Sequence, residues 1–185
     1  DGVFQAVEDN NDSLLAVIGN AIAWLFYPLG WKGGMAWKAT VATITGLIAK
    51  EEVVNTFGVL YHYAGAVDLM EDSSPIWTMV AADFGAVTAY SFMIFNLLCA
   101  PCFAAMGAIK REMNNTKWTL GAIGYMCGFA YVVAMIVYQI GGLIGGVAPF
   151  SVWTVIAFLF LAGILYLLFR KNKYDEGHLT LRSVE

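Results

Sequence analysis

Long apolar runs alternate with short polar connections along the 185 residues of the chain. The runs cover residues 35–61, 84–109, 118–140 and 150–169, and each is long enough to cross a bilayer as an α-helix. A shorter apolar stretch at residues 14–29 precedes them. The pattern predicts an all-α fold, a polytopic transmembrane helix bundle with about four full spans plus one short or re-entrant apolar segment.

The stretch at residues 14–29 is short for a full span, and Pro28 and Gly30 close it. Three interpretations fit a stretch of this length: a re-entrant half-helix, a tilted short span or a segment lying at the membrane interface. The pattern of apolar residues alone leaves all three in place.

Composition agrees with a membrane protein, since 59% of the residues are hydrophobic and 13% are charged, whereas soluble domains are about 25% charged. The net charge of −4 argues against nucleic acid as a partner. The 3 cysteines all lie in apolar runs and do not make a disulfide framework. No nucleophile–base set is visible, so we do not expect an enzyme.

The polar stretches at the two ends define the expected domain organisation. It comprises a polar N-terminal segment at residues 1–13, a transmembrane domain at 14–173 and a cytoplasmic tail at 174–185. Because the chain starts at Asp1 without a signal-like segment, we expect it to be a piece of a longer protein.

Basic residues in the short connections predict the orientation. The connection at residues 110–117 and the cluster at 170–173 are both basic and are separated by two expected spans, so we place both in the cytoplasm. The turn at 141–149 and the acidic connection at 62–83 then lie outside. The same placement puts Lys32 and Lys38 inside.

The most unusual apolar stretch contains Asn96, Cys99, Pro101 and Cys102. On a continuous helix Cys99 and Cys102 share one face, and Asn96 and Met106 extend that face by a turn on either side. Pro101 lacks an N–H group, so it also frees a backbone carbonyl one turn earlier. This combination of thiols, amide and thioether suggests an ion-handling segment, although buried cysteine and methionine also serve simply as core residues.

A second polar group, Lys50, Glu51 and Glu52, lies near the middle of the run at residues 35–61. Charges at membrane depth are costly and usually face the bundle interior or an aqueous cavity. Glu51 is therefore a candidate ion ligand. Two other interpretations remain: Lys50 pairs with a carboxylate on a neighbouring helix, or the helix ends near Ala49 and the charges lie at an interface.

Four motifs together resemble one known family, the bacterial ferrous iron transport protein B (FeoB). They are YPLGW at 27–31, TGLIAKE at 45–51, LLCAPC at 97–102 and AIKRE at 108–112. Their order and spacing are similar to those in the C-terminal permease part of that family. The resemblance implies a second gate repeat in a transporter that carries Fe²⁺ across the bacterial inner membrane.

The resemblance also implies partners and roles. The family has an N-terminal GTP-binding domain, whose phosphate-binding loop is not matched here, so GTP acts only through a domain outside this chain. The other partners implied are the lipid bilayer, the rest of the permease and, as an alternative left open, a second copy in a homo-oligomer. Cys102 matches the gate cysteine and becomes the principal expected ligand, with Cys99, Asn96, Glu51 and Met106 as further candidates for the transported Fe²⁺.

Two other functions are weighed against iron transport. In the first, the gate-type helices only pack against the rest of the permease or against another copy, and the cysteines are core residues. In the second, the chain belongs to a gate-type transporter of another cargo, such as a nucleoside. The paired cysteines around Pro101 favour a metal ion as cargo.

Overall fold

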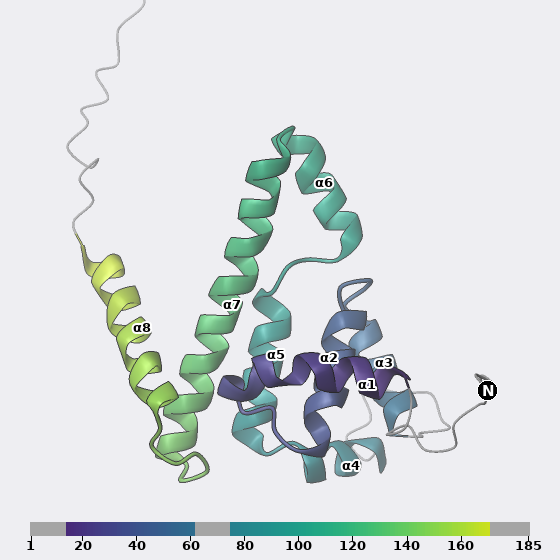
Figure 1. Cartoon of the computed structure of the whole chain (residues 1–185), viewed down its shortest axis with the longest axis vertical. Coiled ribbons are helices and arrows are strands. Elements are labelled where there is room, and N and C mark those ends of the chain that lie inside the picture. Colours follow the sequence, from purple (N-terminus) through teal and green to yellow (C-terminus); the bar gives the residue numbers. More distant parts are fainter. Residues whose placement is uncertain (1–13, 62–74, 171–185) are drawn as a thin grey trace, which may run out of the picture.

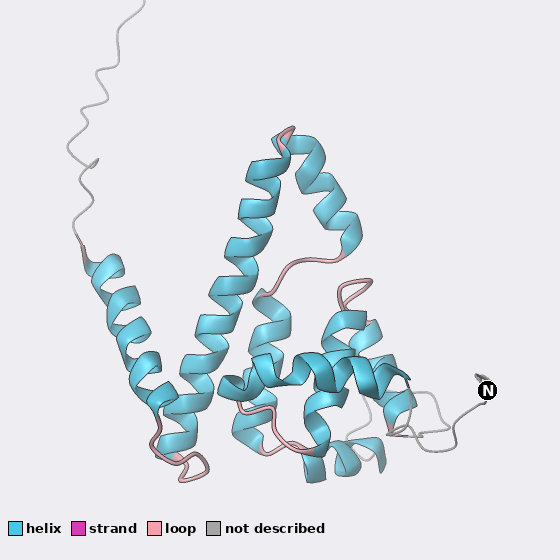
Figure 2. Ribbon diagram, in the orientation of Figure 1, coloured by secondary structure: helices cyan, strands magenta, loops and turns pink. Residues whose placement is uncertain are grey.

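The computed structural model describes residues 14–61 and 75–170, and all the regular structure in these two ranges is helical (Figure 2). The elements, in chain order, are α1 (Leu14–Ala23), η2 (Trp24–Leu29), α2 (Gly34–Thr45), α3 (Glu52–Leu60), α4 (Pro75–Asp83), α5 (Ala86–Leu98), α6 (Phe103–Met113), α7 (Thr116–Ile144) and α8 (Val152–Phe169). The all-α prediction is confirmed. The expected segments at 1–13 and 174–185, and most of the acidic connection at 62–83, lie outside the described residues.

Helices long and apolar enough to cross a membrane number 3 among the described residues, namely Ala86–Met113, Thr116–Ile144 and Val152–Phe169. A bent pair, Leu14–Leu29 with Gly34–Thr45, raises the number to 4 if it forms one broken span. The two parts of that pair meet at 100°, which also fits a re-entrant loop. The chain is a multi-pass membrane protein by these measures, as the apolar runs predict.

The run at residues 35–61 is not one span, because α2 and α3 form an antiparallel hairpin. The hydroxyls of Thr45 and Thr56 lie 2.8 Å apart near its tip. At its base, the Lys38 ammonium lies 4.0 Å from the centre of the Tyr61 ring. The chain therefore enters and returns to the same end of the molecule, as the two helices in Figure 1 show.

The tip of this hairpin, residues 46–51, has a clear sequence origin. A Cβ atom at Gly46 would lie 2.6 Å from a methyl group of Val53, so only glycine lets the returning helix come this close. Lys50 and Glu51 follow in the turn before α3 begins. A turn in contact with polar backbone holds such charges at lower cost than a helix facing lipid.

A second break separates α5 from α6 at residues 99–102, so the expectation of one helix carrying Cys99 and Cys102 on a single face is wrong. Both residues have extended backbone, with ψ of 168° at Cys99 and 161° at Cys102. Pro101 lacks the amide proton that a helix needs, and it disfavours helical geometry at Ala100. The two cysteines therefore stand at opposite ends of an extended bridge.

The prediction that Lys32 and Lys38 lie on the opposite side of the membrane from the connections at 62–83 and 141–149 is wrong. Lys38 forms a 2.9 Å ion pair with Asp83, which belongs to the connection placed outside. Lys32 lines a pocket with Pro149 of the α7–α8 turn, also placed outside. The reason is the α2–α3 hairpin, which returns to its own side and removes one crossing from the count.

Aromatic side chains anchor the N-terminal elements to α5. The Trp31 ring is fully buried and stacks on Phe26 at 4.4 Å between ring centres. The same indole contacts Phe92 at 5.3 Å and Phe95 at 5.7 Å. Helix α5 in turn packs along α7, where the Ser91 hydroxyl donates a 3.1 Å hydrogen bond to the Ala134 carbonyl. Helix α5 is thus held on two sides up to the break that follows it.

Candidate functional site

The two interruptions of the fold meet each other. The amide of Phe103, the first residue of α6, donates a 2.9 Å hydrogen bond to the carbonyl of Leu47 in the hairpin tip. The Lys50 ammonium donates a 2.7 Å hydrogen bond to the carbonyl of Asn96 in the last turn of α5. These contacts lie near the middle of the candidate span Ala86–Met113. We call residues 46–51 and 96–103 together the junction.

Lys50 caps a helix at the junction. The last carbonyls of an α-helix lack partners within the helix, and the helix dipole makes this end electronegative. The half-buried Lys50 side chain supplies both a donor and a positive charge there. The single ion pair among the described residues joins Lys38 to Asp83 instead, so Lys50 acts on backbone and not on a carboxylate.

Cys99 has a partner that sequence reasoning missed. Its side chain is buried, and its sulfur lies 3.6 Å from the sulfur of Cys127 on α7. Cys102 is half-buried at the start of α6. No spacing rule links residues 99 and 127, because only the packing of α5 on α7 brings them together. Two thiolates on one tetrahedral ion, with bonds of about 2.3 Å, stand roughly 3.8 Å apart, so the observed separation is close to that of two ligands.

The other predicted ligands surround the junction without completing a cage. The Asn96 side chain is buried and its amide nitrogen donates to the Phe92 carbonyl at 3.0 Å, which leaves its oxygen as the available acceptor. Glu51 is exposed in the hairpin tip, and Met106 is half-buried in the first turn of α6. Within residues 14–61 and 75–170, no three histidine, cysteine or acidic side chains gather as a metal site.

A pocket of about 320 Å³ opens beside the junction between α3 and α5. Lys50, Asn96 and Leu97 form its junction side, and the rest of the wall is apolar. The pocket gives the polar groups of the junction an opening at the surface of the described chain. A small ion approaching the α5 terminus from this side would meet Lys50 and Asn96 first.

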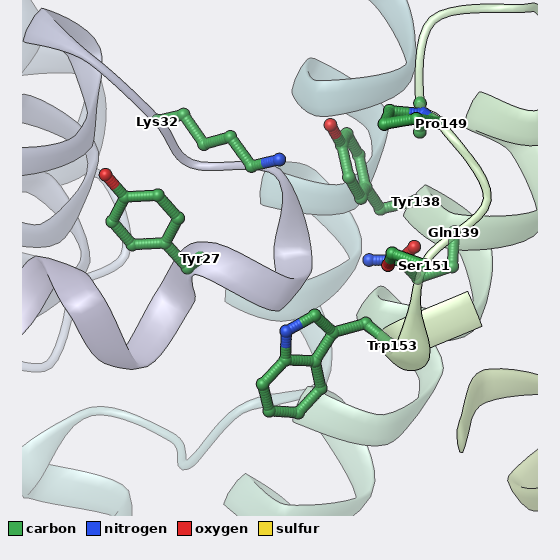
Figure 3. Close-up of a pocket in the computed structure, with 8 residues that line it drawn as sticks. Tyr27, Lys32, Tyr138, Gln139, Pro149, Ser151 and Trp153 are labelled. Carbon is green, nitrogen blue, oxygen red and sulfur yellow. The ribbon is translucent and has the colours of Figure 1, made fainter. Parts of the chain in front are cut away.

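A second, more polar pocket lies at the end of the molecule that carries the α7–α8 turn (Figure 3). Its volume is about 160 Å³, and it is lined by Tyr27, Lys32, Tyr138, Gln139, Ala148, Pro149, Ser151 and Trp153. The Gln139 amide is fully engaged, since it donates to the Pro28 carbonyl at 2.8 Å and accepts from the Thr154 hydroxyl at 3.0 Å. Among the described residues the lining contains a lysine and no carboxylate, so it does not suit a metal cation.

Comparison with known proteins identifies the family of this chain. Residues 9–116 match the model of the Gate family, described as nucleoside recognition. The chain belongs to the Gate family. No solved structure matches it.

Curated proteins that this chain resembles are named Fe(2+) transporter FeoB. The chain is 39% identical over 142 residues to the Fe(2+) transporter FeoB of Methanocaldococcus jannaschii, covering 77% of this chain and 19% of that protein. It is 30% identical over 218 residues to the Fe(2+) transporter FeoB of Legionella pneumophila, covering 95% of this chain and 28% of that protein. The resemblance predicted from the four motifs is therefore confirmed. The chain spans less than a third of the length of these relatives.

Proposed function

We propose that this chain is part of a ferrous iron transporter and that Fe²⁺ crosses the membrane through the junction. The observation that carries the proposal is the meeting of two interrupted helices, tied by Lys50 to Asn96 and by Phe103 to Leu47, beside free thiols. The similarity to proteins named Fe(2+) transporters supports the identity of the ion. Irregular backbone at membrane depth is tolerated where it is covered by protein or lines an aqueous path.

The chemistry of the junction suits a ferrous ion that binds and leaves again. Fe²⁺ accepts thiolate and carboxylate ligands, with amide and carbonyl oxygen as weaker donors. Cys102 remains the principal ligand in this proposal, and Cys99 and Cys127 form a thiol pair nearby. The Asn96 side-chain oxygen and Met106 add weaker donors. A mixed and incomplete set of this kind favours release, whereas a closed four-cysteine cage holds a structural ion.

Charge at the hairpin tip gives the ion a direction of approach. Glu51 is exposed, so it can attract a cation toward the junction from the solvent or from an aqueous cavity. Lys50 then limits how long the ion stays, because its ammonium occupies the Asn96 carbonyl and repels a second positive charge. Attraction by Glu51 at the surface and repulsion by Lys50 within the junction together keep the occupancy of the ion site low, as transport requires.

We extend the proposal to the orientation of this chain and to its partners in the larger protein. The cytoplasmic side holds the α6–α7 turn and the end of α8, where Lys110, Arg111, Lys117 and Arg170 lie. In this proposal the membrane is the bacterial inner membrane, and the C-terminus lies in the cytoplasm. The remainder of the permease and a GTP-binding domain are its partners, and GTP hydrolysis belongs to that other domain, so this chain is not itself an enzyme.

Anaerobic Fe²⁺ uptake by the full-length protein in proteoliposomes tests the proposal. Cys102→Ser is expected to lower the uptake rate by about tenfold or more, since it removes the principal ligand. Cys99→Ser and Cys127→Ser are expected to have smaller effects. Ala104→Ser is the matched control, because it adds a hydroxyl in the first turn of α6 without removing a thiol.

The amount of folded protein in each variant distinguishes iron transport from the two alternative functions. If the cysteines are packing residues, the serine variants lose folded protein and uptake in parallel. If the cargo is a nucleoside, as the description of the Gate family suggests for other members, nucleoside uptake falls while Fe²⁺ uptake is absent from the start. The proposal requires loss of Fe²⁺ uptake at an unchanged amount of folded protein.

A further inference from the structure

The polar pocket of Figure 3 is a built feature at the ends of two candidate spans. It lies between the turn that follows η2 and the turn that joins α7 to α8. Its volume of about 160 Å³ is that of roughly five water molecules. This is enough for one tetrahedral oxyanion, and the pocket takes no part in the junction described above.

Tyr138 presents an unused hydroxyl to this pocket. The residue is only 5% exposed, and its hydroxyl has no hydrogen-bond partner within the described part of the chain. Figure 3 shows this hydroxyl directed toward the space between Lys32 and Pro149. The ring is held in place by Gly30, where a Cβ atom would overlap it and where φ is +87°. Its oxygen is not one of the enclosed polar atoms of the described residues, so the hydroxyl is reached from the pocket and is free to donate to a ligand or to water.

Lys32 gives the pocket its charge. Its side chain is exposed and forms no ion pair with any described residue, and within residues 14–61 and 75–170 no aspartate or glutamate lines the pocket. A cation without a counter-charge beside a fixed hydroxyl attracts an anion. The same arrangement repels Fe²⁺, so this pocket is distinct in its chemistry from the junction.

The remaining lining adds donors and no competing acceptor charge. The Ser151 oxygen accepts the Thr154 amide in the capping box of α8, so its own proton remains free to donate. The rings of Tyr27 and Trp153 form part of the rim. The pocket also lies at the N-terminus of the 18-residue helix α8, whose dipole favours negative charge there. Gln139 is held in place by hydrogen bonds at both ends of its amide and is not one of the proposed contacts.

We propose that this pocket binds a phosphate group, with Lys32 as the charged contact and the Tyr138 hydroxyl as the donor held in a fixed position. The chemistry is shared by two sources, the headgroup of an anionic phospholipid and free inorganic phosphate. The pocket sits where two candidate spans end, at Ile144 and Val152, so a headgroup at the membrane surface reaches it. Aromatic residues at its rim are of the type that gathers at this depth.

The test uses the full-length protein in nanodiscs of phosphatidylcholine, titrated separately with short-chain phosphatidylglycerol and with inorganic phosphate. Lys32→Gln and Tyr138→Phe are expected to weaken binding of the recognised probe by about tenfold. Tyr138→Phe keeps the ring against Gly30 and so preserves the packing. Lys117→Gln, which removes one exposed positive charge at the opposite end of α7, is the matched control and is expected to bind as the wild type does.

The two probes identify the source, and the variants decide the proposal. Binding of phosphatidylglycerol that both pocket variants weaken supports a lipid headgroup, and the same pattern with phosphate alone supports a free anion. The proposal is overturned if neither probe binds, or if both pocket variants bind each probe as tightly as Lys117→Gln. Since this experiment needs no iron, its outcome is independent of the transport proposal.

Discussion

The ammonium of Lys50 and the backbone carbonyl of Asn96 are joined by a 2.7 Å hydrogen bond across 46 positions of the chain. This contact fastens the tip of the α2–α3 hairpin to the end of α5, immediately before the extended bridge that holds Cys99 and Cys102. The contact links the α2–α3 hairpin to α5, so that the two are expected to move together. Movement of the hairpin tip therefore changes the carbonyl environment beside the thiols.

Removal of the Lys50 charge should loosen this unit. We expect Lys50→Met to lower the stability of the folded protein by about 2 kcal/mol, the usual range for a hydrogen bond from a charged donor. Lys50→Arg keeps a donor and a charge and should lose less. Thermal unfolding in detergent measures the effect, with Lys117→Met as the exposed control. Equal midpoints for Lys50→Met and Lys117→Met would contradict the capping role.

Close approach of α2 and α3 depends on Gly46. A methyl group there would meet Val53 at 2.6 Å, so we expect Gly46→Ala to open the hairpin and to reduce both stability and Fe²⁺ uptake. Val53→Ala should restore much of the loss by making room, at its own modest cost in packing. A double-mutant cycle of unfolding midpoints checks this coupling. Strictly additive effects would show that the two side chains do not meet.

The hairpin also fixes which connections share a side of the membrane. We expect Lys32→Cys and Val147→Cys to react with a membrane-impermeant maleimide from the same side. Lys117→Cys and Arg170→Cys should react only from the opposite side. Labelling of intact cells against inverted membrane vesicles measures this, with the wild type as the background for the native thiols. Labelling of Lys32→Cys from the same side as Lys117→Cys would contradict the hairpin. It would mean that residues 35–61 cross the membrane once.

A polar cluster at the base of the hairpin predicts a dependence on pH. Partial burial alone would raise the pKa of Asp83, but the 2.7 Å hydrogen bond from Tyr61 and the ion pair with Lys38 lower it below its ordinary value. A carboxyl with a lowered pKa stabilises the fold above its ordinary pKa and loses that contribution as protons bind. The stabilising effect of Asp83 should therefore fade as the pH falls below about 4.

Asp83→Asn tests this dependence. At neutral pH the variant should unfold at a lower temperature than the wild type, because Lys38 loses its counter-charge. The two unfolding midpoints should stay apart down to about pH 4 and converge as the pH falls from about 4 to about 2. A constant difference over that range would show that the charge of Asp83 is not the stabilising feature.

Much of the fold was predictable from the apolar pattern. The spans that include α7 and α8 follow directly from uninterrupted apolar runs, and these helices have the expected positions. The run at residues 35–61 misled because its length equals that of a span, although Gly46 and Lys50 mark a turn in its middle. The hydropathy of a run does not show whether the chain reverses direction within it. The reversal is seen only in tertiary contacts such as that of Thr45 with Thr56.

The candidate site was predictable only in part. Pro101 marked a segment where the helix breaks, but the spacing of Cys99 and Cys102 suggested a helical face where the chain is extended. The pairing of Cys99 with Cys127 depends on how α5 packs along α7, and no local pattern encodes it. The role of Lys50 was likewise hidden, since its partner is a backbone carbonyl, which every residue carries.

The central claim is that Fe²⁺ meets thiol ligands at the junction, and X-ray absorption at the iron edge tests it most directly. The full-length protein is loaded anaerobically with Fe²⁺ as the wild type, Cys102→Ser and the control Ala104→Ser. Iron–sulfur scattering at about 2.3 Å, similar to zinc–thiolate bonds, is expected in the wild type and the control, with loss or reduction of this scattering in Cys102→Ser. Iron surrounded only by oxygen and nitrogen in all three proteins would contradict the account.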